Sequence, residues 1–261
     1  MLIHNGLTLW TASEVVAGRS LPDDKRKALV DIARWSQHFL VSGHPELGRT
    51  GPVCPFSRPS MNRDLFFLAY AEVGGDTGET VKTILLYRDW HAEIAAELGE
   101  KERQFLTVLI LLPSFDHEDP TELNDLQAQL KDEFVTQGLM IGQFHPHCEE
   151  PGLWNQDFRP LQAPLPLLAI RYMVPSDLPF LIGQQRHVDA YLARFAADIP
   201  GRVRTQLTEL IVRPLMRQPL LKSAQSVLVP SNSFPGGCRH QPTTASTSSP
   251  EPPRGRNSPP D

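Results

Sequence analysis

The stretch Phe105-Leu-Thr-Val-Leu-Ile-Leu-Leu112 is the strongest strand candidate in the chain, and the rest of the fold has to be built around it. It is far too short to cross a membrane, and its length and β-branched residues favour a buried strand. Because apolar side chains occupy both of its faces, the strand has to be covered on both sides. We therefore predict that it lies in the centre of a sheet.

Helices and further strands are predicted on both sides of this segment. Apolar residues recur at helical spacing in four places, and three other segments have the composition of strands. The helices are expected near 20–43, 77–98, 121–137 and 188–195, and the strands at 64–73, 139–144 and 166–174. Ser20 is the expected N-cap of the first helix. The last two strands are joined by a long irregular segment and not by a helix, which argues against a uniform βαβ repeat. The sequence thus predicts an α+β fold, a small mixed or antiparallel sheet packed with helices.

The chain is expected to have three parts: an N-terminal extension over 1–19, a single α+β domain over 20–213, and a tail over 214–261. The tail is rich in Pro, Ser and Thr, as in Thr243-Thr-Ala-Ser-Thr-Ser-Ser-Pro250. Such a composition has too little apolar surface to offset the entropy lost on ordering. We predict that the tail is disordered, and its role stays open.

Composition narrows the class of protein. The net charge is −5, and no basic stripe is present, which disfavours nucleic-acid binding. The first residues lack a basic region followed by a long apolar core, so they make a poor signal peptide. The three cysteines are an odd set, which favours a reducing compartment over a disulfide framework. We expect a cytoplasmic protein that binds neither nucleic acid nor membrane; the oligomeric state stays open.

His145 and His147 lie in the densest polar stretch, Gly142-Gln-Phe-His-Pro-His-Cys-Glu-Glu150, where a strand becomes a loop. In extended backbone, residues two apart point to the same side, so the two imidazoles form a candidate metal pair. His145 is also the first candidate for acid–base catalysis. The alternative is a polar loop whose histidines cap backbone groups.

Cys54 lies in a stiff apolar loop, Gly51-Pro-Val-Cys-Pro-Phe56, in which Pro52 and Pro55 fix the path of the chain. The thiol is a candidate catalytic nucleophile. Because a proline follows it, Cys54 is also a candidate ligand for haem iron. The alternative is a free cysteine that packs as a small apolar side chain.

Arg171 interrupts the apolar strand Leu167-Leu-Ala-Ile-Arg-Tyr-Met-Val174. A buried guanidinium without a partner is very costly, so Arg171 has to meet an anion. Asp177, six residues later, is the internal candidate. The other candidate is a carboxylate or phosphate of a bound substrate.

The segment Gly152-Leu-Trp-Asn-Gln-Asp-Phe-Arg-Pro160 is a long loop in which aromatic and polar residues alternate. Loops of this kind often bind ligands, and Trp154, Asn155 and Arg159 are therefore candidate substrate-binding residues. The alternative is a packed connection. Glycine-rich nucleotide motifs, the hydrolase Gly-x-Ser-x-Gly and His-Glu-x-x-His are all absent, which reduces the case for those functions.

Taken together, the stretches 51–56 (GPVCPF), 138–146 (GLMIGQFHP) and 164–181 (PLPLLAIRYMVPSDLPFL) resemble a bacterial domain family of unknown function. The resemblance implies a shared domain over about residues 20–200, and it implies no particular reaction.

Three functions remain open from the sequence. The first is a small-molecule enzyme or accessory protein of specialised metabolism that binds an anionic substrate through Arg171. The second is a non-catalytic binding or interaction domain. The third, which rests on the Cys-Pro-Phe and Phe-Arg-Pro stretches, resembles a haem- or metal-dependent oxygenase. The cofactor is therefore open as well, with haem and a divalent metal as the candidates.

Overall fold

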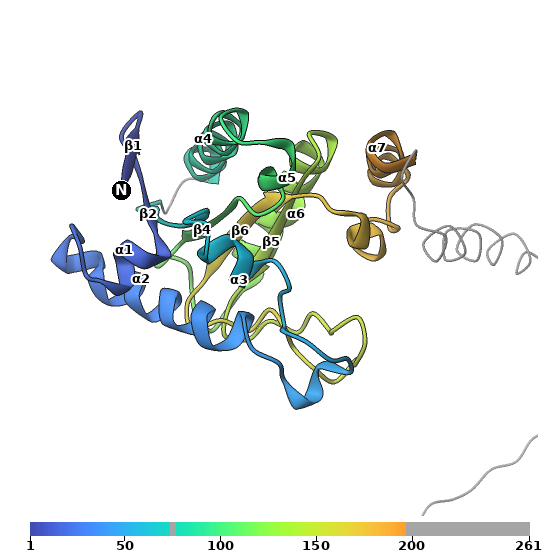
Figure 1. The fold of residues 1–261 in the computed structure, drawn as a ribbon, viewed down its shortest axis with the longest axis horizontal. Coiled ribbons are helices and arrows are strands. Elements are labelled where there is room, and N and C mark those ends of the chain that lie inside the picture. Colours follow the sequence, from blue (N-terminus) through green and yellow to red (C-terminus); the bar gives the residue numbers. More distant parts are fainter. Residues whose placement is uncertain (74–76, 197–261) are drawn as a thin grey trace, which may run out of the picture. The chain divides into compact units, whose positions relative to one another are not determined.

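The structure is a computed structural model and describes residues 1–73 and 77–196. Its centre is a mixed six-stranded sheet with the order β1-β2-β3-β4-β6-β5 (Figure 1). The strands are β1 (Leu2–His4), β2 (Leu7–Thr11), β3 (Phe66–Tyr70), β4 (Thr107–Leu111), β5 (Leu139–Phe144) and β6 (Leu167–Tyr172). The α-helices are α1 (Ala12–Val16), α2 (Asp23–Trp35), α3 (Ser57–Met61), α4 (Thr77–Ala96), α5 (Glu100–Arg103), α6 (Thr121–Thr136) and α7 (Gln185–Phe195). A π-helix, η1 (Ser36–Leu40), continues α2, and two 3₁₀ helices are η2 (Pro45–Leu47) and η3 (Pro175–Phe180).

Strand β4 lies inside the sheet, and all five of its residues are buried. It pairs with β3 in parallel, because the connection through α4 returns the chain to the end of the sheet at which β3 begins. It pairs with β6 in the antiparallel sense, as β5 also does. The prediction of a central strand and that of a mixed sheet with helices are both confirmed.

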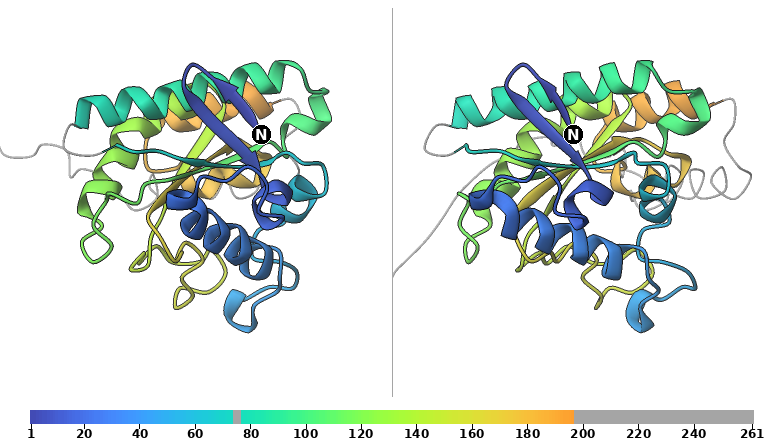
Figure 2. Two further views of the ribbon diagram at one scale, coloured as in Figure 1. Left: turned by 90° about the vertical axis from the view of Figure 1, so that its left-hand side faces the viewer. Right: turned by 60° about the vertical axis from the view of Figure 1, so that its left-hand side comes forward.

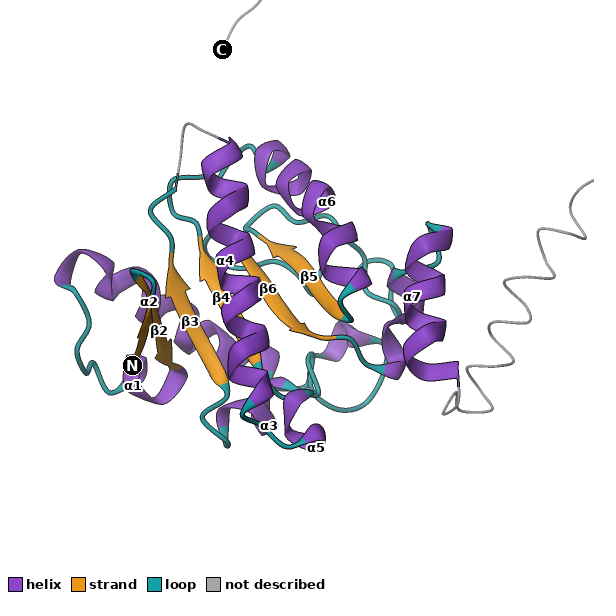
Figure 3. Ribbon diagram, turned by 90° about the horizontal axis from the view of Figure 1, so that it is seen from above, coloured by secondary structure: helices purple, strands orange, loops and turns teal. Residues whose placement is uncertain are grey.

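Helices cover the two faces of the sheet unequally. Long apolar helices α4 and α6 cover one face, where Ile84, Leu126 and Phe134 pack against Val108 and the other residues of the larger core. Figures 2 and 3 show α4 crossing over the strands, with α6 beside it. Shorter elements, α1, α2 and η1, cover the opposite face. We call this second side the α2 face.

Residues 1–19, expected as an extension, lie in the same compact unit as the rest of the described domain. Strand β2 pairs with β3, and it buries Leu9 in the larger core and Trp10 in the core of the α2 face. The expected N-cap at Ser20 is wrong: α2 is preceded by Pro22, and Ser20 has a positive φ of 53°. The predicted disordered tail over 214–261 lies outside the described residues. Within the described residues, no helix has the length and apolar character needed to cross a membrane.

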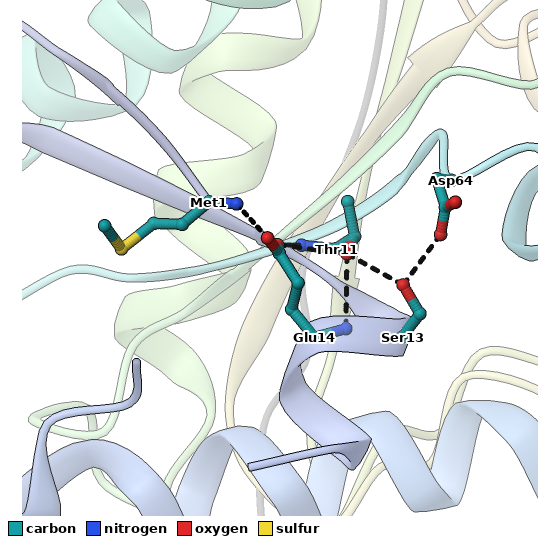
Figure 4. A network of polar contacts seen from close by, with 5 residues as sticks. All are labelled: Met1, Thr11, Ser13, Glu14 and Asp64. Carbon is teal, nitrogen blue, oxygen red and sulfur yellow. Dashed lines mark hydrogen bonds and ion pairs between the residues drawn. The ribbon is translucent and has the colours of Figure 1, made fainter. Parts of the chain in front are cut away.

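A polar network holds this N-terminal part in place (Figure 4). The Thr11 hydroxyl accepts a hydrogen bond from the backbone N–H of Glu14, and the Glu14 carboxylate accepts one from the backbone N–H of Thr11. This reciprocal cap starts α1. The Glu14 carboxylate also forms an ion pair with the amino group of Met1. Next to it, Ser13 Oγ donates to Asp64 Oδ1 at 2.7 Å, which ties α1 to the turn before β3.

Leu109→Ala should destabilise the domain by about 2–5 kcal/mol, because Leu109 is 2% exposed at the centre of β4 and its loss leaves a cavity. Chemical denaturation measures this difference. Leu86→Ala on α4 is the control: this side chain is 44% exposed, and the change should cost less than about 0.5 kcal/mol. A cost below about 1 kcal/mol at Leu109 would contradict its central position.

His91 should make the domain sensitive to acid. Burial lowers the pKa of His91 to about 4, against the opposing effect of its hydrogen bond to the Leu106 carbonyl. The unfolded chain, with a pKa near 6.5, therefore takes up a proton first as the pH falls. The stability due to neutral His91 is complete above about pH 6.5 and is lost as the pH falls to about 4, a difference of about 3 kcal/mol.

Denaturation of wild type and His91→Leu between about pH 7 and pH 4 measures this effect. The variant should lose less stability over that window than the wild type does. Leu86→Ala, which changes an exposed side chain that does not titrate, should keep the slope of the wild type. Equal slopes for wild type and His91→Leu would show that His91 does not titrate in this way.

Candidate functional site

The register of β5 and β6 decides which side chains share the α2 face. Phe144 lies opposite Leu167, Gly142 opposite Ala169 and Met140 opposite Arg171. Residues directly opposite each other in a sheet project to the same side. Phe144, Leu167 and Ala169 pack in the core of the α2 face, so all six residues lie on this side of the sheet. At one end of it, Met140 packs with Leu178 and Tyr191 instead, and Arg171 pairs with Asp177.

Gly142 and Ala169 leave the middle of this face partly uncovered. Both residues are partly exposed, although β6 lies between β4 and β5. A Cβ atom added at Gly142 would meet only Cε2 of Phe144, at 3.8 Å, which is ordinary van der Waals contact. A glycine inside a strand often marks a place where a ligand or another backbone approaches closely. We call these two residues the Gly142–Ala169 patch.

One half-buried aromatic side chain, Phe144, lies beside the patch, and two more pack next to it. Trp35 meets the ring of Phe144 edge to face, with centroids 5.8 Å apart, and stacks on Phe39 at the same distance. Trp35 ends α2, and Phe39 lies in η1, so the π-helical turn sets the position of one ring relative to the other. Such turns inside helices occur frequently at functional sites.

The Cys54 loop closes onto the end of η1. The backbone N–H of Cys54 donates to the Leu40 carbonyl, and that of Val53 donates to the Ser42 carbonyl, both at 2.8 Å. Cys54 is partly exposed and packs against the core of the α2 face. It interacts electrostatically with Arg171, whose Cζ lies 6.0 Å from the ring centroid of Phe56. The structure therefore brings the Cys54 loop and Arg171 together.

Arg171 is held by Asp177. Its Nη1 and Nη2 donate to the two carboxylate oxygens at 2.7 Å each, and Nη1 also donates to the Tyr172 carbonyl. Asp177 also accepts the N–H of Val174. Burial lowers the pKa of Arg171, but the charge and hydrogen bonds of Asp177 more than offset this, so that the pKa is raised. Of the two partners expected for Arg171, the internal one is present.

His145 lies away from Arg171 and does not join it in one pocket. Arg171 is opposite Met140, and His145 follows five residues later along β5, about 17 Å at the rise of a strand. The sequence-based expectation that Cys54, His145 and Arg171 converge within about 10 Å is wrong for this pair, because five residues of the chain lie between Met140 and His145 and the Arg171 side chain reaches Asp177 at the other end of β6. His145 is 2% exposed, and neither ring nitrogen has a hydrogen-bond partner among the described residues. Burial, with a smaller effect from His147, lowers its pKa.

The two histidines proposed as metal ligands have different surroundings. His147 is exposed, and its Nε2 lies 3.4 Å from a carboxylate oxygen of Glu118, whereas His145 is buried. Across residues 1–73 and 77–196, no group of three or more His, Cys, Asp and Glu is placed to hold a metal ion. Cys148, which follows them, is buried, and burial raises the pKa of its thiol. Among the described residues, the predicted metal pair His145 and His147 therefore has no third ligand beside it.

The other expected substrate-binding residues hold loops together or face solvent. Asn155 Nδ2 donates to the Glu46 carbonyl at 2.7 Å, and Asn155 Oδ1 accepts from the N–H of Asp157. Arg159 donates to the carbonyls of Gln156 and Phe158 in its own loop. The Trp154 residue is 65% exposed. None of these contacts places the three side chains at the Gly142–Ala169 patch.

Residues 29–206 match the family model described as Domain of unknown function (DUF6875). The chain belongs to this family. The match confirms the resemblance to a family of unknown function that the sequence indicated. It covers most of α2, the Cys54 loop, the strands β3 to β6 and the ion pair of Arg171 with Asp177. Comparison with curated proteins and with solved structures gave no match.

The sequence interpretation missed the residues that shape the patch of this DUF6875 domain. Trp35 and Phe39 have helical spacing, which indicated only a buried helix face. The informative sign was Gly142, a glycine inside a predicted strand. Ala169 gives no such sign, because alanine is common in buried positions.

Asp177→Asn should destabilise the domain, because it leaves Arg171 without a countercharge. Breaking a fully buried pair typically costs 3–5 kcal/mol. The side chain of Arg171 is 25% exposed, so solvent screens part of that cost, and we expect about 2–3 kcal/mol. The double change Arg171→Met with Asp177→Leu should recover most of this loss in chemical denaturation, since apolar replacements of an ion pair are often neutral. Additive losses in the double variant would contradict the pairing.

Proposed function

We propose that this domain binds a small, largely apolar organic molecule on the Gly142–Ala169 patch. The observation that carries the proposal is that two small residues, Gly142 and Ala169, lie opposite each other and are both partly exposed inside the sheet, and that an added Cβ at Gly142 would meet only Phe144 Cε2, in ordinary van der Waals contact. A cavity-filling residue at this position would improve the burial of the α2 face. Two adjacent small residues at such a place suit a ligand that supplies the missing contacts.

The rings around the patch favour a flat, apolar ligand. Phe144 and, next to it, Trp35 and Phe39 are all partly exposed, and each can pack face or edge against an aromatic group. Ligand sites are lined mainly by apolar and aromatic side chains with few polar groups. The polar groups near this site are the Cys54 thiol and the Arg171–Asp177 pair.

The ion pair favours a neutral ligand over an anionic one. Asp177 occupies both Nη atoms of Arg171 in a bidentate arrangement. The pair as a whole has no net charge, so it attracts an anion less than a free guanidinium does. This reduces the case for the anionic substrate that the sequence suggested and supports a binding function. The observation in favour of chemistry is Cys54, a partly exposed thiol that packs on the core of the α2 face and interacts with Arg171.

Filling the patch tests the proposal. Gly142→Leu and Ala169→Leu should each keep the fold and abolish ligand binding, because their side chains take the space of the ligand. Gly183→Leu is the control: an added Cβ there meets no atom within 4 Å, and the position lies outside the patch. Ligand-detected NMR with indole and with indole-3-acetate measures binding to the four proteins, and circular dichroism confirms that each is folded.

We expect indole to bind the wild type and Gly183→Leu and to lose at least tenfold in affinity with either filling variant, the factor given by about 1.4 kcal/mol. Equal binding to all four proteins, or none to the wild type, would refute the proposal. Stronger binding of indole-3-acetate than of indole would instead support the hypothesis of an anionic substrate. A Soret band in the purified protein would instead favour the haem alternative, with Cys54 as its candidate ligand.

A further inference from the structure

A serine interrupts the apolar stripe by which α2 and η1 pack on the sheet. Ser36 follows Ile32 and Ala33 by four and three residues, and Leu40 follows Ser36 by four, so these side chains lie on one side of the helix. The three apolar residues belong to the core of the α2 face, and Ser36 is 0% exposed. The side chain of Ser36 therefore points toward the sheet.

The hydroxyl of Ser36 has no hydrogen-bond partner within the described part of the chain. A serine inside a helix can donate to the carbonyl four residues before it, and Ser36 does not make this bond. A buried hydroxyl that leaves water without gaining a new partner destabilises the fold. An alanine would serve the packing of the helix better, so packing alone does not account for the hydroxyl.

Ser36 lies over the inner strands of the sheet, next to the ligand patch. Trp35, one residue earlier, meets Phe144 of the edge strand β5. The stripe that contains Ser36 packs instead with the inner strands β4 and β6. In these strands, Leu109 lies opposite Ala169, the inner member of the patch. The hydroxyl is therefore directed at the part of the sheet that contains the inner end of the Gly142–Ala169 patch.

We propose that Ser36 is a polar contact of the ligand site, and that the ligand is a flat apolar molecule with one hydrogen-bond donor, such as a ring N–H. This inference rests on the proposed binding function and narrows its class of ligand. Ligand sites combine apolar walls with a few polar groups that fix the orientation of the ligand. Phe144, with Trp35 next to it, supplies the wall, and Ser36 Oγ accepts the hydrogen bond. A serine oxygen accepts two hydrogen bonds but donates one, which favours a ligand that donates.

Two serine variants separate a ligand contact from the general effect of a buried hydroxyl. Ser36→Ala removes the hydroxyl and keeps the helix, because alanine is the most favourable helical residue. Ser60→Ala is the matched control: Ser60 of α3 is also 0% exposed, and its hydroxyl also lacks a partner among the residues described. The Ser60 carbonyl accepts from the N–H of Leu65, just before β3, and β4 separates β3 from the two strands of the patch.

Indole and 1-benzothiophene separate the hydrogen bond from the apolar contact, since their ring systems have nearly the same shape and only indole has an N–H. Ligand-detected NMR gives the ratio of their two dissociation constants for each protein. Ser36→Ala should shift this ratio about fivefold in favour of 1-benzothiophene, the factor that corresponds to one hydrogen bond of about 1 kcal/mol. Ser60→Ala should keep the ratio of the wild type.

The outcomes distinguish this inference from the proposed function. An unchanged ratio in Ser36→Ala, while indole binds the wild type and is lost in Gly142→Leu, would overturn the role of Ser36 and leave the proposed function in place. That result would assign the hydroxyl to a buried water only. If neither molecule binds the wild type, both proposals are refuted.

Thermal melting of the ligand-free proteins gives a second test. Because each alanine removes a buried hydroxyl without a partner, Ser36→Ala and Ser60→Ala should both melt at or above the temperature of the wild type. A drop of several degrees with Ser36→Ala would show that its hydroxyl bonds within the protein itself, which would overturn the inference.

Discussion

Burial of β4 on both faces is the constraint that organises this domain. A strand without a polar face needs a strand on each side and a layer of side chains above and below it. Strand β3 and strand β6 satisfy the first need, and the helices on the two faces satisfy the second. The two layers are unequal, because α4 and α6 are long helices, whereas the α2 face combines shorter helices with two loops. The Gly142–Ala169 patch lies on the α2 face.

Much of this fold could be predicted from the sequence, because hydrophobic periodicity is a local property. The strands β3, β4, β5 and β6 and the helices α2, α4, α6 and α7 all follow it. The N-terminal hairpin was missed although it carries a local sign: β1 pairs with β2 across Asn5-Gly6, both with positive φ, a dipeptide typical of tight hairpin turns. Only the pairing of β2 with β3 depends on a distant segment. The π-helix was missed as well, since a wider helical turn leaves no sign in residue spacing.

The site was less predictable than the fold, because its key properties depend on register and on contacts between distant segments. The sequence correctly gave Asp177 as one of two possible partners for Arg171, since burial demands a countercharge. It wrongly placed His145 near Arg171, because the number of residues between two strands does not reveal their pairing. The patch itself depends on Gly142 lying opposite Ala169, which only the register of β5 and β6 determines.

The N-terminal network of Thr11, Ser13 and Glu14 lies outside the part of the chain that the family model matches. The family match begins at residue 29, after β1, β2 and α1. A chain trimmed to those limits would leave β3 as a bare sheet edge, with unpaired backbone groups ready to pair with another molecule. It would also uncover the apolar surface that Leu9 and Trp10 now cover. Self-association of such a fragment would reflect its missing border strand and would say nothing about the assembly of the whole protein.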